Sequence, residues 1–174
     1  MKIAALLAGG DRRSIGRSNE VVAVIRERPR LFGELIRCLW SGDPIIRMRA
    51  ADAAEKVSAS RPELLAPFKT ELLGLLVEAD QQEMRWHLAQ MIPRLPLNSM
   101  DRRRARTTLR SFLDDDSSIV KTCAMQALAD LAGPDARSRS EVAALIEELV
   151  RKGTPAMKAR GRKLLKQLIK DPAK

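Results

Sequence analysis

The residues of this chain best suited to chemistry stand together in one short stretch, EMRWHLAQMIPRL, at positions 83–95. It holds His87, the only histidine, beside Trp86, one of two tryptophans. An imidazole can act as a general acid or base near neutral pH, but only with an orienting partner and a convergent pocket. No Ser or Cys is placed for a catalytic triad by a visible motif. We therefore expect His87 to be a half-buried helix residue without a catalytic role.

Other motifs that carry chemistry are missing from the sequence. One histidine rules out a His-rich metal site, and Cys38 and Cys123 lack the paired spacing of a zinc motif. The sequence contains no GxxxxGK[ST], GxGxxG or HExxH pattern. The stretch GGDRRSIGRS at 9–18 lacks the lysine and the preceding strand of a phosphate loop, which favours a cap and turn. We predict two buried reduced thiols, no metal, no cofactor and no enzymatic activity.

The composition is that of one soluble helical domain. The 174 residues are 45% hydrophobic and 31% charged, without tyrosine and with only three phenylalanines. The opening MKIAALLAGG resembles a signal peptide, but its apolar run is short, and nothing approaches the roughly 20 apolar residues of a transmembrane helix. We expect a cytoplasmic protein.

The stretch 83–95 is part of a sequence repeat with a period of about 37 residues. Its most regular feature is an apolar residue followed by a basic one, and the steps between successive pairs are 38, 36 and 37 residues. The four pairs are Ile46-Arg47, Met84-Arg85, Val120-Lys121 and Met157-Lys158.

Three further columns of the repeat are small or aliphatic. They lie four, eight and eleven residues after the apolar anchor, which places them on one stripe of an α-helix. Small residues in the first of these columns predict that helices approach closely there. The columns are Ala50, Leu88, Ala124 and Gly161; Ala54, Ile92, Leu128 and Leu165; and Val57, Leu95, Leu131 and Leu168.

A second amphipathic segment precedes each of these helices, so the repeating unit is predicted to be a helical hairpin. Asp43 before Pro44 is an N-cap with proline at the first helical position, and Thr154-Pro155 repeats this arrangement. Asp80 with Glu83 three residues later resembles a capping box. The leading segments are 29–43, 63–80, 98–116 and 138–153.

The N-terminus fits this scheme less well. The stretch IAALLAGGD at 3–11 is expected to be the end of a truncated leading helix, and Asp11 to open a helix that carries Ile15, Val22 and Ile25. The spacing from Asp11 to Asp43 is only 32 residues, so this unit is degenerate. End repeats commonly are, because they pack against only one neighbour.

The segments DPIIRMRAADAAEKV at 43–57 and EMRWHLAQMIPRL at 83–95 resemble the second helix of HEAT repeats, and the pattern is similar to this armadillo-like family over most of the chain. The resemblance implies an all-α fold, an α-α superhelix (solenoid) of about 4.5 hairpins in a right-handed stack. It implies a single domain over 1–174, with a degenerate N-terminal repeat at 1–27 and a basic C-terminal cap at 151–174. The full repeats would lie near 29–57, 61–95, 98–132 and 138–169. Most members are scaffolds and adaptors, so the resemblance implies binding.

Acidic residues at the turns and basic residues four or five positions later form a ladder along the repeats. In HEAT-like stacks such residues tie neighbouring repeats together, and an aspartate also caps its helix. The long basic side chains, including Lys121, could instead reach outward to an anionic ligand, and both interpretations stay open for them. The predicted structural ladder is Asp43, Arg47, Asp80, Arg85, Asp116 and Lys158.

Trp86 is out of phase with the core stripe. Its column also holds Met48, Thr122 and Ala159, and we expect this column to be exposed on the second helices, which the resemblance makes the concave face. Trp86 either anchors a partner there, as large aromatic residues do in interfaces, or folds over Pro93 or the next repeat.

One HEAT-like enzyme class, the alkylpurine DNA glycosylases, uses a tryptophan and an aspartate one turn apart on the concave surface. Here the residue one turn after Trp86 is Gln90. The aspartate of that column is Asp52, one repeat earlier and opposite Met48. The pair is broken, which makes a glycosylase relative the weakest of the alternatives.

The net charge of +10 is concentrated at the C-terminus. Residues 151–174 contain nine Lys or Arg and one acid, which gives +8 and leaves +2 for residues 1–150. A second basic cluster lies at 101–106. A terminal repeat needs a polar outer face, but not a face of one sign. Dense positive charge attracts polyanions without sequence preference.

These features together predict a non-enzymatic HEAT-repeat scaffold or adaptor that binds a partner, foremost a protein, through its concave second-helix face and its basic cap. The alternative is sequence-independent binding of the DNA or RNA backbone through the C-terminal helix; an anionic membrane surface could use the same field. The expected partner-binding residues are Arg49, Trp86, Gln90, Lys121, Arg160, Arg162, Lys163 and Lys166.

Overall fold

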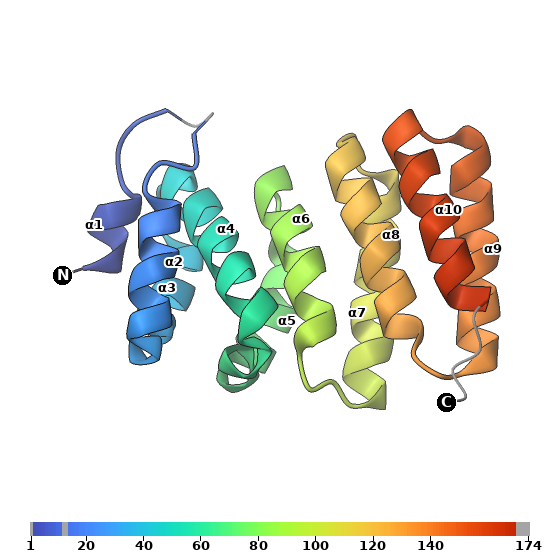
Figure 1. The fold of residues 1–174 in the computed structure, drawn as a ribbon, viewed down its shortest axis with the longest axis horizontal. Helices are drawn as coiled ribbons and strands as arrows, with labels where there is room; N and C mark the ends of the chain where they lie inside the picture. The colour runs from blue at the N-terminus through green and yellow to red at the C-terminus, as the bar shows by residue number, and fades with distance from the viewer. Residues whose placement is uncertain (1, 12–13, 170–174) are drawn as a thin grey trace. The chain divides into compact units, whose positions relative to one another are not determined.

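The computed structural model describes residues 2–11 and 14–169. Every regular element in these ranges is a helix, so the prediction of an all-α protein is confirmed (Figure 1). The chain divides into two compact units, Met1–Pro96 (unit 1) and Leu97–Lys174 (unit 2), and each is described by itself. The superhelical stack of HEAT-like hairpins and the single domain over 1–174 stay predictions.

Unit 1 contains six α-helices and four short 3-10 helices among its described residues. The α-helices are α1 (Ile3–Leu7), α2 (Ser18–Glu27), α3 (Phe32–Arg37), α4 (Pro44–Ser60), α5 (Lys69–Glu78) and α6 (Gln82–Met91). The 3-10 helices are η1 (Pro29–Leu31), η2 (Cys38–Trp40), η3 (Pro62–Phe68) and η4 (Ile92–Arg94).

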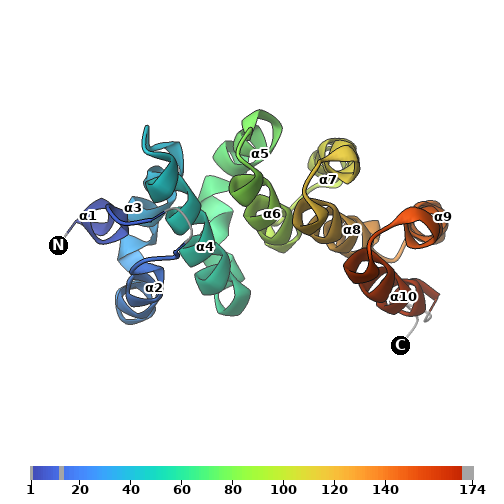
Figure 2. The ribbon, with the colours of Figure 1, turned by 90° about the horizontal axis from the view of Figure 1, so that it is seen from above.

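The central helix of unit 1 is α4, which lies between α2 and α6 and also contacts α1 and α3 (Figures 1 and 2). It starts where the sequence predicts, because the Asp43 carboxylate accepts a hydrogen bond of 2.8 Å from the backbone N–H of Ile45 and Pro44 fills the first position. Small side chains allow neighbours on several sides. Four fully buried alanines serve this purpose, at positions 50, 51, 53 and 54.

Proline shortens two of the expected helices of unit 1. Pro67 lies inside η3, so the leading helix predicted at 63–80 becomes a 3-10 turn followed by α5. Pro93 lies inside η4, where it ends α6 at Met91. Both follow from the missing N–H of proline, which removes a hydrogen bond of the α-helical ladder.

The N-terminal helix expected to open at Asp11 is not formed there, and this part of the prediction is wrong. Helix α2 begins at Ser18, and Ile15 lies before it with 42% of its surface exposed. Gly16 has φ +52°, a left-handed conformation that an α-helix does not continue through. Val22 and Ile25 are buried on α2, as expected.

Unit 2 consists, in its described part, of two helical hairpins packed together, with α8 in contact with α7, α9 and α10 (Figures 1 and 2). Side chains of Asn98, Ser117 and Asp135 cap the first three α-helices by accepting a hydrogen bond from a first-turn N–H. The elements are α7 (Ser99–Ser111), η5 (Phe112–Asp114), α8 (Ser118–Ala132), α9 (Ala136–Lys152) and α10 (Pro155–Ile169).

The repeat columns form the cores of both units. Ala50, Leu88 and Ala124 are fully buried, and Gly161 of the same column is buried in unit 2. A Cβ on Gly161 would lie 3.1 Å from Cε of Met125 and closer still to Val150. The close helix approach predicted from this column is therefore present at Gly161, because only glycine leaves room for α9 and α8.

Candidate partner-binding surfaces

A cluster of polar side chains joins α2 to α4 in unit 1. The carboxylate of Asp52, only 8% exposed, accepts hydrogen bonds from the Ser18 hydroxyl at 2.5 Å and from Nζ of Lys56 at 2.7 Å. Lys56 also donates to the side chain of Asn19 on α2 at 2.9 Å. A buried carboxylate is stable when its charge is paired and its oxygen atoms are hydrogen-bonded. Asp52 is thus engaged as a structural tie and is not a free nucleophile.

His87 on α6 is more deeply buried than expected, at 9% exposure. Burial lowers its pKa, although the carboxylates of Asp52, Glu55 and Glu83 oppose this and Lys56 adds to it. The ring lies edge-on to Trp86, with centroids 5.6 Å apart, and Nδ1 has no hydrogen-bond partner. A catalytic base needs a group that orients it, so this environment favours a buried neutral imidazole.

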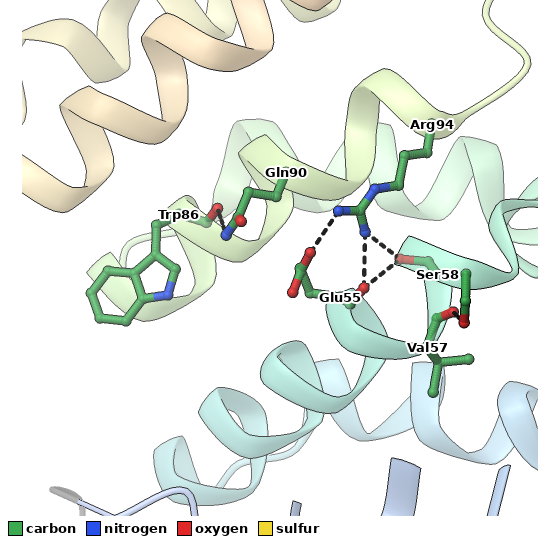
Figure 3. A network of polar contacts seen from close by, with 7 residues as sticks. Glu55, Val57, Ser58, Trp86, Gln90 and Arg94 are labelled. Carbon is green, nitrogen blue, oxygen red and sulfur yellow. Dashed lines mark hydrogen bonds and ion pairs between the residues drawn. The ribbon is translucent and has the colours of Figure 1, made fainter. Parts of the chain in front are cut away.

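Trp86 and Gln90 lie one turn apart on α6, and both are half-buried (Figure 3). The Gln90 side-chain amide donates to the backbone carbonyl of Trp86 at 3.2 Å, so this side chain folds back onto its own helix. The indole of Trp86 points away from the neighbouring polar network, as Figure 3 shows. Of its column, Met48 is buried, contrary to expectation, Thr122 is half-buried and Ala159 is exposed.

Arg94 makes a network between η4 and α4 that the sequence analysis missed (Figure 3). Its guanidinium donates to the Glu55 carboxylate at 2.6 Å, to the Glu55 backbone carbonyl at 2.8 Å and to the Ser58 hydroxyl at 2.9 Å. Glu55 and Arg94 are 39 residues apart, close to one repeat. A search for opposite charges about one period apart would have found this pair.

Arg49, predicted to bind a partner, is buried instead, with 2% of its surface exposed. Its guanidinium donates to the backbone carbonyls of Leu7, Gly9, Asp11 and Ser14, in the segment before α2. These carbonyls satisfy a charged group that could not otherwise be buried. Arg49 therefore fixes the N-terminal segment and is not on the surface of unit 1.

The ladder residues of unit 1 bond mainly near the turns. The Arg47 guanidinium donates to Gln81 at 3.3 Å and to the Ser41 carbonyl at 2.8 Å, while Gln81 donates to the Pro44 carbonyl at 3.2 Å. Arg47 and Gln81 thereby tie α4 to the segment before α6. Gln81, and not Asp80, is the N-cap residue of α6, and Arg85 donates to the Ala79 carbonyl at 2.8 Å.

In unit 2, Lys121 and Asp116 border a cavity of about 210 Å³ beside the first turns of α8 and α10. A second cavity of about 490 Å³ shares Leu113, Leu149 and Lys152 with it. Acidic and basic side chains occur in equal number around the two cavities, so charge gives no preference for one kind of ligand. They are Arg110, Lys121 and Lys152, against Asp114, Asp116 and Glu148.

Helix α10 presents the most strongly charged surface of unit 2. It carries five basic residues and no acidic one, and none of the five has an ion pair with another described residue. Arg160, Arg162, Lys163 and Lys166 are exposed, and Lys158, a predicted ladder residue, is half-buried. Residues 170–174 of the predicted basic cap lie outside the described part of the chain.

The end of α10 is held by α9. Arg139 donates to the backbone carbonyls of Gln167 and Leu168, which are among the last carbonyls of α10 without a helical partner. A cation at a helix C-terminus also opposes the negative end of the helix dipole. The basic face is therefore carried on a helix fixed at its C-terminal turn.

Within the described ranges, no three His, Cys, Asp or Glu side chains are grouped so that they could hold a metal ion. Cys38 is buried, which raises its pKa, and Cys123 is half-buried. In the same ranges no helix is both long and apolar enough to cross a membrane.

No protein-family model and no curated protein matches this sequence. The candidate surfaces are therefore judged on the geometry of this chain alone.

Proposed function

We propose that the protein is a non-enzymatic binding module, a scaffold or adaptor of HEAT-like architecture, which holds an anionic macromolecular partner, foremost a protein. The partner would contact the second helix of each predicted hairpin, which are α4, α6, α8 and α10. On α10 it would contact the exposed basic residues. In this proposal the hairpins of both units form one α-α superhelix, and recognition depends on complementary charge along a rigid surface.

One observation carries this proposal, namely the five basic side chains of α10 that no acidic side chain of the described residues neutralises. Other exposed charges of unit 2 include pairs of opposite sign, such as Lys152 with Glu148 at 2.9 Å and Arg137 with Glu141 at 3.1 Å. A surface needed only for solubility is satisfied by mixed charges. Unpaired charge of one sign on a packed helix favours an anionic partner.

The environment of the second helices of unit 1 supports a binding role over catalysis. Asp52 is engaged by Lys56 and Ser18, and Gln90 stands one turn after Trp86 where a glycosylase-like pair would need an acid. Trp86 is the large half-exposed side chain of this surface and is proposed as a contact residue.

A second candidate is binding of the DNA or RNA backbone. It is favoured by further exposed arginines on α7, at positions 103, 104 and 110, which have no ion pair with another described residue. Binding of single-stranded nucleic acid is less favoured, because it usually relies on exposed aromatic side chains that stack on the bases. The only aromatic residue of 97–174 is Phe112, and it is buried.

The test is charge reversal with a matched control. In the first variant Arg162, Lys163 and Lys166 become Glu, and in the control the three α7 arginines become Glu, with the same change in net charge. Cross-linked complexes from the native cell are compared by mass spectrometry. We expect the amount of each specific partner cross-linked to the α10 variant to fall by at least about tenfold, and the amount cross-linked to the control to be unchanged. Equal losses in both variants would show bulk charge attraction and overturn the proposal.

The nucleic-acid alternative is tested separately with labelled duplex and single-stranded DNA at two salt concentrations. Duplex binding at low salt that is weakened in both the α10 variant and the α7 variant would replace the protein partner by nucleic acid. Absence of binding at low salt would remove this alternative.

A further inference from the structure

One side of α10 is uncovered although the same side of α8 is packed. Met125, Leu128 and Ala132 of α8 are 0%, 1% and 4% exposed. Helix α10 packs beside α8, and Gly161 lies against Cε of Met125. Unit 2 thus shows how a helix covers this side of a second helix in the repeat.

The equivalent residues of α10 lie 37 positions later, and their surroundings differ. Arg162 corresponds to Met125, Leu165 to Leu128 and Ile169 to Ala132. Ile169 is 77% exposed, Arg162 is exposed and Leu165 is half-buried. Within the described part of unit 2, the helices that α10 packs against are α9 and α8. We name Lys158, Arg162, Leu165 and Ile169 the lateral face of α10.

The lateral face combines two apolar side chains with two cations. Exposed Ile169 and half-buried Leu165 are one turn apart, and Arg162 is one turn from both Lys158 and Lys166. A stripe that begins with two cations and ends with two apolar residues fits an amphipathic helix that combines acidic and apolar side chains on one face. A second copy of the same face fits less well, because it would add cations and no carboxylate to the contact.

We infer that the lateral face of α10 docks an acidic amphipathic helix of a partner protein, which packs on α10 as α10 packs on α8. This inference rests on the proposed binding function and names the partner's chemistry and contact side. The partner helix places apolar side chains on Leu165 and Ile169 and carboxylates near Lys158 and Arg162. Helices in such contacts have axes about 8–10 Å apart.

The residues on the other exposed side of α10 allow the contact side to be tested. Arg160 and Lys163 correspond to Cys123 and Gln126 of α8, which are half-buried, and helical periodicity places both on the side of α10 opposite the lateral face. Arg160 is therefore the matched control for Arg162, since both are exposed arginines on one helix. Neither side chain belongs to the core, so both variants are expected to fold.

The probe is a fluorescent synthetic peptide with the sequence of residues 154–169 in which all five Lys and Arg are replaced by Glu. It keeps the apolar stripe with which α10 packs on α8. The comparison peptide has the unaltered basic sequence. Binding to the full-length protein is measured by fluorescence anisotropy, and folding of each variant is checked by circular dichroism.

We expect saturable binding of the acidic peptide and at least about tenfold weaker binding of the basic one. Ile169→Asp and Arg162→Glu should each weaken binding of the acidic peptide by about tenfold, and Arg160→Glu by less than about threefold. The double variant Lys158→Glu/Arg162→Glu should gain affinity for the basic peptide. Equal effects of Arg160→Glu and Arg162→Glu, or no effect of Ile169→Asp, would overturn the inference.

Failure of this inference is distinguishable from failure of the proposed function. If the Arg162/Lys163/Lys166 variant loses the cross-linked partners while binding of the acidic peptide is unchanged by Ile169→Asp and Arg162→Glu, the lateral face is not the docking site and the binding function stands. If neither the partners nor the peptide depends on α10, both are overturned.

Discussion

Gly161 of α10 and Val150 of α9 lie so close together that a Cβ on Gly161 could not be accommodated without a shift of Val150. At this position α10 lies close to both α9 and α8. Any methyl group here must also meet Met125 and Ile146, at 3.1 and 3.3 Å.

Gly161→Ala is therefore expected to destabilise the protein, by about 1–3 kcal/mol, because overpacking outweighs the better helix propensity of alanine. The matched control is Gly74→Ala on α5, where a Cβ would meet nothing within 4 Å. The control should be neutral or stabilising by up to about 1 kcal/mol. Urea denaturation followed by circular dichroism measures both. A gain in stability from Gly161→Ala would contradict the packing of α10.

Arg49 organises the N-terminal segment by donating to four backbone carbonyls. Arg49→Met should lower the free energy of unfolding by about 3 kcal/mol, since these carbonyls lose a charged donor. Arg49→Lys should rescue only part of this loss, because an ammonium group cannot reproduce the planar fork of a guanidinium.

Hydrogen exchange followed by mass spectrometry checks where the effect of Arg49 lies. The Met variant should lose protection mainly in residues 2–11 and 14–17, and little in unit 2. Unchanged exchange in these residues would refute the anchoring role.

His87 should make the stability depend on pH. Burial lowers its pKa in the folded state, so between the folded pKa and the unfolded value of about 6.5 the unfolded chain binds more protons. The contribution of His87 is fully present above the unfolded pKa and is lost as the pH falls toward the folded pKa. Because His87 is the only histidine, NMR of one imidazole signal gives this pKa directly.

Several charged groups near His87 also affect its pKa, and the His87→Gln variant serves as the control for the pH dependence. Asp52 and Glu55 raise the pKa, as does Glu83 on the same helix, while Lys56 lowers it. The slope of stability against pH below the unfolded pKa should therefore be smaller in His87→Gln than in the wild type. A titration midpoint at or above that of an unfolded His87 peptide would contradict the inferred burial.

The Glu55 and Arg94 side chains form a pair with little solvent access, at 16% and 25% exposure, and the arginine also bonds to the backbone. A double-mutant cycle with Glu55→Gln and Arg94→Gln should give a coupling free energy of about 1–2 kcal/mol. The exposed pair of Glu148 and Lys152, at 52% and 76%, is the control and should give about 0.5 kcal/mol or less. Equal coupling free energies in the two cycles would show that burial does not strengthen the pair of Glu55 and Arg94.

The sequence by itself determined the all-helical fold, the start of α4 and most of the core columns, because these depend on local periodicity and on capping residues. Asp43 caps α4 through the backbone of Ile45, two residues away. The Ala50 and Ala124 columns are buried because a helix repeats its face every few residues. The small residue at 161 also predicted the close approach found there.

Only the tertiary structure decided what each charged or aromatic side chain meets. Arg49 and Arg160 share one column, yet Arg49 is buried and Arg160 exposed, because carbonyls 35 to 42 residues earlier in the chain surround only the first. Ile169 is exposed where Ala132 is packed, although the two residues hold equivalent positions of the repeat. Periodicity fixes the direction of a side chain on its own helix, but its partners come from segments distant in sequence.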